Sequence, residues 1–220
     1  MPDKEKKISR FSNSKLQFAL LVLILLIGAY FRFSGINWDE NYHLHPDERF
    51  LTMVESSISP VKNISEYFNT EISSLNPYNS GYSFFVYGTL PIFFIRYFAG
   101  WLGQADYGHV FIIGRYFSGI FDLLSILIVF LITQRLYKNK WMSLLAASLV
   151  SVSVLSIQLS HYFTVDSFTN FFTVLAIYFA VCVINDFPNK IRKPITRTSG
   201  FFPFFTLIFI KDVSILFLIS

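Results

Sequence analysis

The chain has 220 residues, of which 53% are hydrophobic and 15% are charged, and its formal net charge is +4. A water-soluble domain normally carries about 25% charged residues, so this composition excludes intrinsic disorder and favours a chain that lies largely in a lipid bilayer. Cys182 is the only cysteine, which excludes a fold built on intrachain disulfides.

The predicted elements begin with a basic cytoplasmic tail at 1–15 and a first membrane span at 16–34. The apolar run exceeds the 7–15 residues of a signal-peptide core and no clear cleavage site follows it, so we expect an uncleaved span. An outer loop comes next, at 35–110. It includes two helices that we expect to lie flat on the membrane, near 46–58 and 89–102.

Three further spans are predicted within 111–187, because three apolar runs approach the roughly 20 residues that cross a bilayer: 112–133, 141–159 and 167–184. A cytoplasmic basic loop follows at 188–200. A partial or truncated span is expected at 201–220. The sequence therefore predicts an all-α polytopic membrane protein with about four to five transmembrane helices.

The orientation of these elements follows from the lysines and arginines. Twelve of the eighteen lie in three clusters beside apolar runs, before residue 16, at 135–140 and at 190–197. Such clusters are typical of cytoplasmic loops, whereas a nucleic-acid-binding protein concentrates its basic residues on one face. We therefore expect no nucleic-acid partner, a plasma-membrane location and a cytoplasmic N-terminus.

The segment 83–103 is apolar and aromatic but is broken by Gly88, Pro91 and Arg96. If it crossed the bilayer, the second and third basic clusters would both lie outside, whereas all three share the cytoplasmic side if it does not cross. A helix over 90–102 would also measure only about 20 Å, against a hydrocarbon core of about 30 Å. We therefore expect it to lie in the outer interface.

Polar residues gather in the first outer loop. Residues 35–82 hold seven of the fourteen acids, and five acids and histidines lie within nine residues: Asp39, Glu40, His43, His45 and Asp47. A carboxylate beside the bilayer could act as general base for an acceptor hydroxyl or could bind a divalent metal. The alternating spacing of His43, His45 and Asp47 could present three ligands on one edge. The sequence thus leaves a divalent metal open and indicates no certain cofactor.

The same window predicts a helix. Pro46 suits a first helical turn, and Asp47 and Glu48 suit its positive end, so capping alone is the alternative interpretation of these two acids. An apolar stripe follows at helical spacing and is expected to lie on the membrane: Phe50, Leu51, Val54 and Ile58. The density of acids and histidines favours a functional site.

Other candidate residues lie in the spans and in the second outer connection. Asp166 follows His161 in a short outer connection, where the start of the next helix favours a negative charge, so capping is again the alternative. Asp122 lies about mid-span, where an acid is costly and marks a functional site by default. Arg115 lies seven residues earlier on the same helix face. Asp122 could pack against another span, and Arg115 could do so or bind a phosphate.

The spaced motifs resemble the C superfamily of glycosyltransferases, which includes protein O-mannosyltransferases, lipid A aminoarabinose transferases and galacturonosyltransferases. The resemblance covers roughly residues 16–187. It rests on four motifs: Trp38-Asp39-Glu40, His45-Pro46-Asp47-Glu48-Arg49, Tyr87-Gly88-Thr89-Leu90-Pro91 and Gly114-Arg115-Tyr116-Phe117-Ser118. Enzymes of this superfamily use a sugar on undecaprenyl or dolichyl phosphate as the donor, and their acceptors vary.

The resemblance implies that Asp47 is the general base, with Asp39 as the alternative motif acid, and that Glu48 and Asp166 complete the catalytic set. It implies an outer-face site that transfers the sugar to a hydroxyl of a lipid, glycan or protein. Other residues are expected to bind substrate: Asp39, Glu40, His43, His45, Arg49, Arg96, Arg115 and His161. Arg115, Arg96 and Arg49 are, in that order, the candidates for stabilising the leaving phosphate.

Length separates this chain from that superfamily, whose members usually have several hundred residues and more spans. The chain stops inside its fifth apolar run, so we expect an N-terminal fragment of a longer enzyme, which as a truncated chain could lack activity of its own. Two alternatives are a non-catalytic membrane subunit and a small transporter or channel component, the latter using Asp122 and Arg115.

Overall fold

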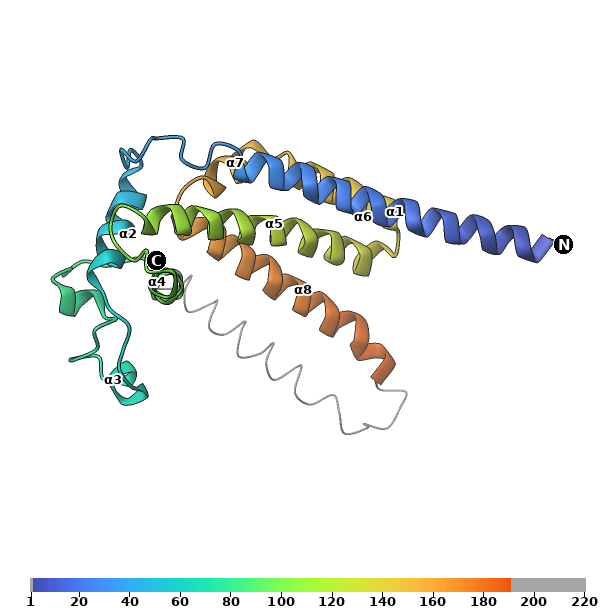
Figure 1. Cartoon of the computed structure of the whole chain (residues 1–220). Helices are drawn as coiled ribbons and strands as arrows, with labels where there is room; N and C mark the ends of the chain where they lie inside the picture. The colour runs from blue at the N-terminus through green and yellow to red at the C-terminus, as the bar shows by residue number, and fades with distance from the viewer. Residues whose placement is uncertain (1, 191–220) are drawn as a thin grey trace.

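The computed structural model describes the backbone of residues 2–190 and the side chains of residues 14–185, and it contains only helices and loops over that range. Its long helices run alongside one another (Figure 1): α1 (Pro2–Phe33), α5 (Val110–Tyr137), α6 (Lys140–Ser151) with α7 (Val154–Ser160), and α8 (Asp166–Lys190). The segment 35–110, which was predicted to be the first outer loop, holds four short elements: α2 (Pro46–Ser57), α3 (Ile64–Phe68), the 3-10 helix η1 (Pro77–Ser80) and α4 (Thr89–Leu102).

Three of these helices are long and apolar enough to cross a bilayer, at Ser14–Phe33, Val110–Tyr137 and Asp166–Asn185, and α6 with α7 makes a fourth if the pair forms one span. The predicted all-α membrane fold is therefore confirmed. Helix α1 begins at Pro2 and so includes the predicted basic tail. The predicted basic loop beyond residue 190 and the predicted segment at 201–220 lie outside the described residues.

The third predicted span, 141–159, is not a single straight helix. Helix α6 ends at Ser151 and α7 begins at Val154, with a bend of 57° between them. A break leaves backbone carbonyls without helical partners, which is costly away from water. Here the Arg32 side chain donates hydrogen bonds to the carbonyls of Ser151 at 2.9 Å and Val150 at 3.4 Å. The two carbonyl groups at the break thus accept hydrogen bonds from a residue of the neighbouring helix α1.

Helices α2 and α4 lie across the direction of α1 and α5, at the end of the bundle where the outer loop joins it (Figure 1). Pro46 occupies the first turn of α2, and the Nδ1 atom of His45 caps it by accepting a hydrogen bond from the Glu48 amide at 3.4 Å. Helix α4 has 14 residues and ends at Gly103, whose φ of 68° suits glycine. At about 21 Å it is too short to span.

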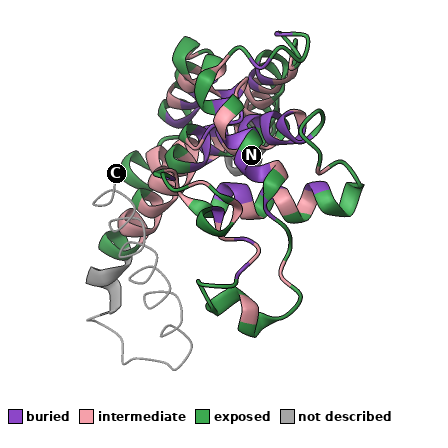
Figure 2. Cartoon of the chain, turned by 90° about the vertical axis from the view of Figure 1, so that its left-hand side faces the viewer, coloured by how far each residue is buried: buried purple, intermediate pink, exposed green. Residues whose placement is uncertain are grey.

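The apolar stripe of α2 does not lie on the membrane, and that expectation is wrong. Leu51, Val54 and Ile58 are fully buried within the protein. They belong to one core cluster with the inner face of α4 and the start of α5: Ile92, Ile95, Ala99, Val110 and Ile113. Figure 2 shows buried residues gathered where these elements meet the long helices. The outer loop is therefore a packed layer that holds its N-terminal acids in fixed positions.

Candidate functional site

The centre of the outer layer is a buried arginine, Arg115, on the first turns of α5. Its guanidinium donates two hydrogen bonds to Glu48, at 2.7 and 2.6 Å, and two to Asp39, at 3.0 and 2.9 Å. A fifth contact reaches the carbonyl of Ile36 at 2.9 Å. Trp38 and Phe111 lie over the guanidinium plane, with ring centroids at 5.5 and 4.8 Å. All five N–H groups of Arg115 are therefore engaged.

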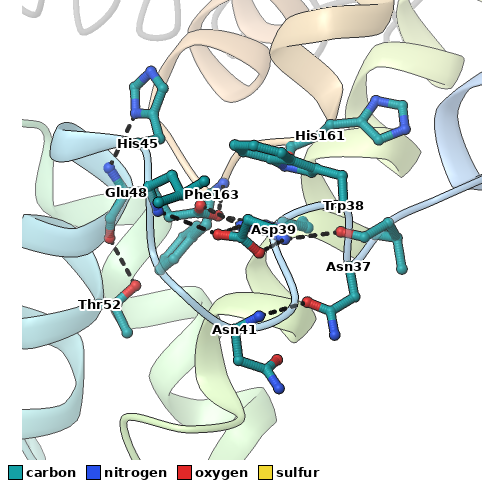
Figure 3. Close-up of polar contacts among 12 residues, drawn as sticks. Asn37, Trp38, Asp39, Asn41, His45, Glu48, Thr52, His161 and Phe163 are labelled. Carbon is teal, nitrogen blue, oxygen red and sulfur yellow. Dashed lines mark hydrogen bonds and ion pairs between the residues drawn. The ribbon is translucent and has the colours of Figure 1, made fainter.

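Glu48 also binds the connection between α7 and α8, which comprises residues 161–165. Its Oε1 atom accepts a hydrogen bond from the backbone amide of Phe163 at 2.7 Å, and Figure 3 shows Glu48, Asp39 and Phe163 converging on this place. The Phe163 ring packs directly on Gly114, where a Cβ atom would overlap it. Glycine is thus required beside Arg115 so that the second connection can approach α5 closely.

Asp39 and Glu48 are both buried, with exposed fractions of 3% and 0%. Burial alone would raise the pKa of Asp39, but the hydrogen bonds and the positive charge of Arg115 outweigh it and hold that pKa below its ordinary value. The Asp39 carboxylate is thereby kept ionised inside the protein. In this structure both carboxylates bind Arg115, and Glu48 also binds the amide of Phe163.

Asp47 has the opposite environment. It is exposed at the start of α2, and its Oδ1 atom accepts a hydrogen bond from the Tyr87 hydroxyl at 3.0 Å. Burial, this hydrogen bond and the negative charges of Asp47 and Asp166 all raise the pKa of Tyr87. The charge of Asp166 therefore acts on the same hydroxyl that Asp47 binds. The structure thus holds the Asp47 carboxylate through a hydroxyl 40 positions further along the chain.

Asp166 is the first residue of α8 and is exposed, while Ser167 and Phe168 behind it are buried. At a helix N-terminus its charge is stabilised by the helix dipole. Because Phe163 is fixed three residues earlier by Glu48 and Gly114, the start of α8 is tied to the same network that holds α2. The helices that carry Asp47 and Asp166 are thus connected through the contact between Glu48 and Phe163.

The other two candidate arginines differ in their environment. Arg49 is exposed, and no ion pair to it is found in the described part of the chain. Arg96 of α4 is half-buried and donates from Nη1 to the backbone carbonyls of Ala105 at 2.7 Å and Glu55 at 3.5 Å. Of the three predicted phosphate ligands, Arg49 is the one whose side chain faces solvent without a carboxylate partner.

Two of the predicted histidines, His43 and His161, make packing contacts or hydrogen bonds within the protein. The His43 ring is buried between Tyr107 and Phe111, at centroid distances of 4.4 and 4.3 Å, and burial lowers its pKa against the opposing effect of the Asp39 and Glu48 charges. The two ring nitrogens of His161 contact the carbonyls of Ile157 at 2.8 Å and Ser34 at 2.9 Å.

Two further substrate-binding candidates lie at the edges of the layer. His45 caps α2 and stacks on Tyr162 at a centroid distance of 4.3 Å. Glu40 is exposed in a turn with a φ of 49°. Among the described residues, neither side chain forms a hydrogen bond with the side chains of Arg115, Asp39 or Glu48.

The proposed metal triad does not assemble in this structure. His43 is buried against aromatic rings, His45 caps a helix and Asp47 accepts from Tyr87. Within residues 14–185, no group of three histidine, cysteine or acidic side chains is arranged to hold a metal ion.

Asp122 and Arg115 do not pair with each other, although they share a helix face. Asp122 accepts a hydrogen bond from the Nε atom of Arg32 at 2.6 Å, with both side chains buried. Arg32 also donates to the carbonyl of Gly28 on its own helix at 3.0 Å. Asp122 is therefore part of a contact between spans.

Sequence reasoning missed three contributors to these networks. Tyr87 was recognised as part of a motif and as an aromatic residue that could stack on a sugar, but the hydrogen bond from its hydroxyl to Asp47 was not predicted. Arg32 could have been found from its position near the end of a span, because mid-span Asp122 requires a cation. Phe163 contributes through its backbone amide, and no side-chain signal could have indicated that.

Residues 96–192 match the family of dolichyl-phosphate-mannose-protein mannosyltransferases, which is rather less than half of the chain. The matched segment contains Arg115, Phe163 and Asp166, and it begins after Asp47 and Tyr87. No curated protein and no solved structure matches the chain significantly. The family match and the apolar helices together support an integral membrane protein similar to the C-superfamily glycosyltransferases.

Proposed function

We propose that this chain carries the donor and catalytic site of a glycosyltransferase, which moves a sugar from a polyprenyl-phosphate carrier to an acceptor hydroxyl on the outer membrane face. The observation that carries the proposal is an exposed carboxylate, Asp47, which the Tyr87 hydroxyl holds next to Glu48 of the buried Arg115 network. The family match over 96–192 supports the donor class. The acceptor is a hydroxyl of a lipid, glycan or protein.

In the proposed reaction the acceptor oxygen attacks the anomeric carbon, and the bond from that carbon to the carrier phosphate oxygen breaks. The acceptor proton passes to Asp47, and the carrier leaves as a phosphate anion. Asp47 suits the role of base because it is exposed, whereas Asp39 and Glu48 are enclosed by Arg115. The Tyr87 hydrogen bond holds the Asp47 carboxylate in one orientation.

The leaving phosphate requires a cation at the membrane surface. We assign this role to Arg49 in preference to Arg115, which has all its donors engaged. Arg49 is the exposed candidate arginine and lies in the first turns of α2, the helix that also carries Asp47. Asp166 supports the site from the facing segment and keeps the local field negative around the proposed base.

The transport alternative is less well supported by the contacts. It relied on intramembrane Asp122 and on Arg115, and both are engaged in buried ion pairs. Such satisfied pairs more commonly hold helices together than conduct ions.

The test is sugar transfer by an Asp47→Asn variant in membranes, with dolichyl-phosphate mannose and undecaprenyl-phosphate mannose as donors and release of the free carrier phosphate as the readout. Removing a general base should slow release by about a hundredfold or more. Glu71→Gln is the matched control, because Glu71 is exposed in the same loop and lies outside the proposed site. Release at the wild-type rate by Asp47→Asn would contradict the proposal.

A further inference from the structure

A pocket of about 430 Å³ lies between α1, α5 and α6, at the end of the bundle away from Asp47. In Figure 1 this is the region where the N-terminal half of α1 passes the junction of α5 and α6. Three helices contribute to its lining: Ser14, Lys15, Gln17, Phe18, Leu21, Phe130 and Lys140. None of the proposed catalytic residues contacts it.

The lining has a polar end and an apolar end. Lys15 and Lys140 supply two cations, and Ser14 and Gln17 supply neutral hydrogen-bonding groups. Phe18 and Leu21 follow along α1 towards the membrane interior, with Leu21 about 9 Å deeper than Lys15 at the helical rise of 1.5 Å per residue. The lining residues include no acid. A ligand that fits must therefore be anionic at one end and apolar at the other.

The surroundings of Lys140 favour an anion there. It is the first residue of α6, and Asn139 caps that helix by accepting from the amides of Trp141 and Met142. The helix dipole adds positive potential at this end. In the described part of the chain no carboxylate forms an ion pair with Lys140. Trp141 is 51% exposed beside it, as aromatic residues at a bilayer interface usually are.

From this we infer that the pocket binds an anionic glycerophospholipid of the leaflet at the basic ends of the spans, with its phosphate at Lys15 and Lys140 and an acyl chain along Phe18, Leu21 and Phe130. Basic pockets between spans are suited to anionic headgroups. The apolar half of the lining distinguishes a lipid from free phosphate, which would leave it empty. The bound lipid would hold α1 against α5 and α6, far from the site of sugar transfer.

The test uses the full chain, purified and delipidated in detergent, and native mass spectrometry with phosphatidylglycerol or phosphatidylcholine of identical acyl chains. Wild-type protein should bind phosphatidylglycerol with clear preference. Lys15→Gln and Lys140→Gln should each weaken that binding about fivefold. Lys138→Gln is the matched control, because Lys138 lies in the same junction but outside the lining, and it should bind as the wild type does.

A second measurement on the unmodified protein guards against variants that fail to fold. Phosphatidylglycerol with a photoactivatable acyl chain should label the peptides that contain Leu21 and Phe130. Three results would overturn the proposal: labelling spread evenly over the spans, equal weakening by Lys138→Gln, or displacement of the lipid by inorganic phosphate together with loss of that labelling. The last result would identify a site for free phosphate instead.

Discussion

Two buried arginines, Arg115 and Arg32, each donate several hydrogen bonds but in different surroundings. Arg115 binds two carboxylates from the outer loop and one backbone carbonyl. Arg32 binds one carboxylate, Asp122, and directs its remaining donors to carbonyls of α1 and of the broken α6. The first network joins loops to a span, and the second joins spans to one another.

The difference indicates what each network supports. The Arg115 network includes Glu48, the neighbour of Asp47, and Glu48 also binds the amide of Phe163, three residues before Asp166, so the network fixes the segments that carry both exposed acids. The Arg32 network lies among the long helices and satisfies a break in the third span. Disturbing the first should affect both stability and sugar transfer, whereas disturbing the second should affect stability alone.

The largest effect is expected for Arg115→Met. The substitution leaves Asp39 and Glu48 as two buried carboxylates without a cation, which should cost about 3–5 kcal/mol of unfolding free energy and abolish transfer. Arg115→Lys should also fail, because an ammonium group cannot make two bidentate contacts. Thermal unfolding in detergent measures the first effect and carrier release the second. Normal stability in Arg115→Lys would contradict the account of the network.

Arg32→Met should be nearly as destabilising, because it strands Asp122 and exposes the carbonyls of Val150 and Ser151. The double variant Arg32→Met with Asp122→Leu should recover part of the lost stability, since no buried charge then remains. Its transfer rate per folded molecule should equal that of the wild type. A stable double variant without transfer would break the distinction between the two arginines.

Glu55 is a buried acid that neither arginine satisfies. Both of its oxygens lack a hydrogen-bond partner, and burial raises its pKa to about 8 against the opposing charge of Arg96. The folded protein thus keeps a proton that the unfolded chain loses above its ordinary pKa of 4.5. The contribution of Glu55 to stability should therefore be fully present below pH 4.5 and should be lost as the pH rises towards about 8, by at most ~1.4 kcal/mol per pH unit.

Glu55→Gln is the variant that tests this pH dependence. It should flatten the pH profile of the thermal midpoint across that window, because an amide carries no titrating proton. If the thermal midpoint of the variant fell with pH as that of the wild type does, the pH dependence would belong to another titrating group.

The smallest effect is expected for Gly114→Ala. The new methyl group must displace the Phe163 ring, which should cost about 1–3 kcal/mol and slow transfer by loosening the connection that leads to Asp166. Gly100→Ala in α4 is the matched control, since a Cβ there meets open space and alanine favours the helix. Thermal unfolding of the two variants compares them. Equal thermal midpoints for Gly114→Ala and Gly100→Ala would contradict the role of Gly114 in holding the Phe163 connection.

Much of the helical architecture could be predicted from the sequence. Apolar runs and Pro46 located the spans, α2 and α4 to within a few residues, because helix starts and bilayer thickness act locally. The break between α6 and α7 could not be predicted in this way. It depends on Arg32, a residue 118 positions away from the nearest carbonyl that it satisfies in that segment.

The site was predicted less completely, for the same reason. The acids were identified from their density, but their roles depend on which of them Arg115 encloses. Asp39 and Asp47 have similar local surroundings in sequence, yet one is buried against a guanidinium and the other faces solvent. The stripe on α2 was assigned to lipid because helical periodicity cannot distinguish a protein partner from a membrane.

The most direct test of the central claim compares two adjacent acids, Asp47 and Glu48, by carrier release per folded molecule. The account predicts that Asp47→Asn loses release while its thermal midpoint stays at the wild-type value, because Asp47 is exposed and acts on the acceptor. It predicts that Glu48→Gln lowers the midpoint, because Glu48 holds Arg115 and Phe163. Wild-type release by Asp47→Asn, or a Glu48→Gln protein of normal stability that has lost release, would contradict it.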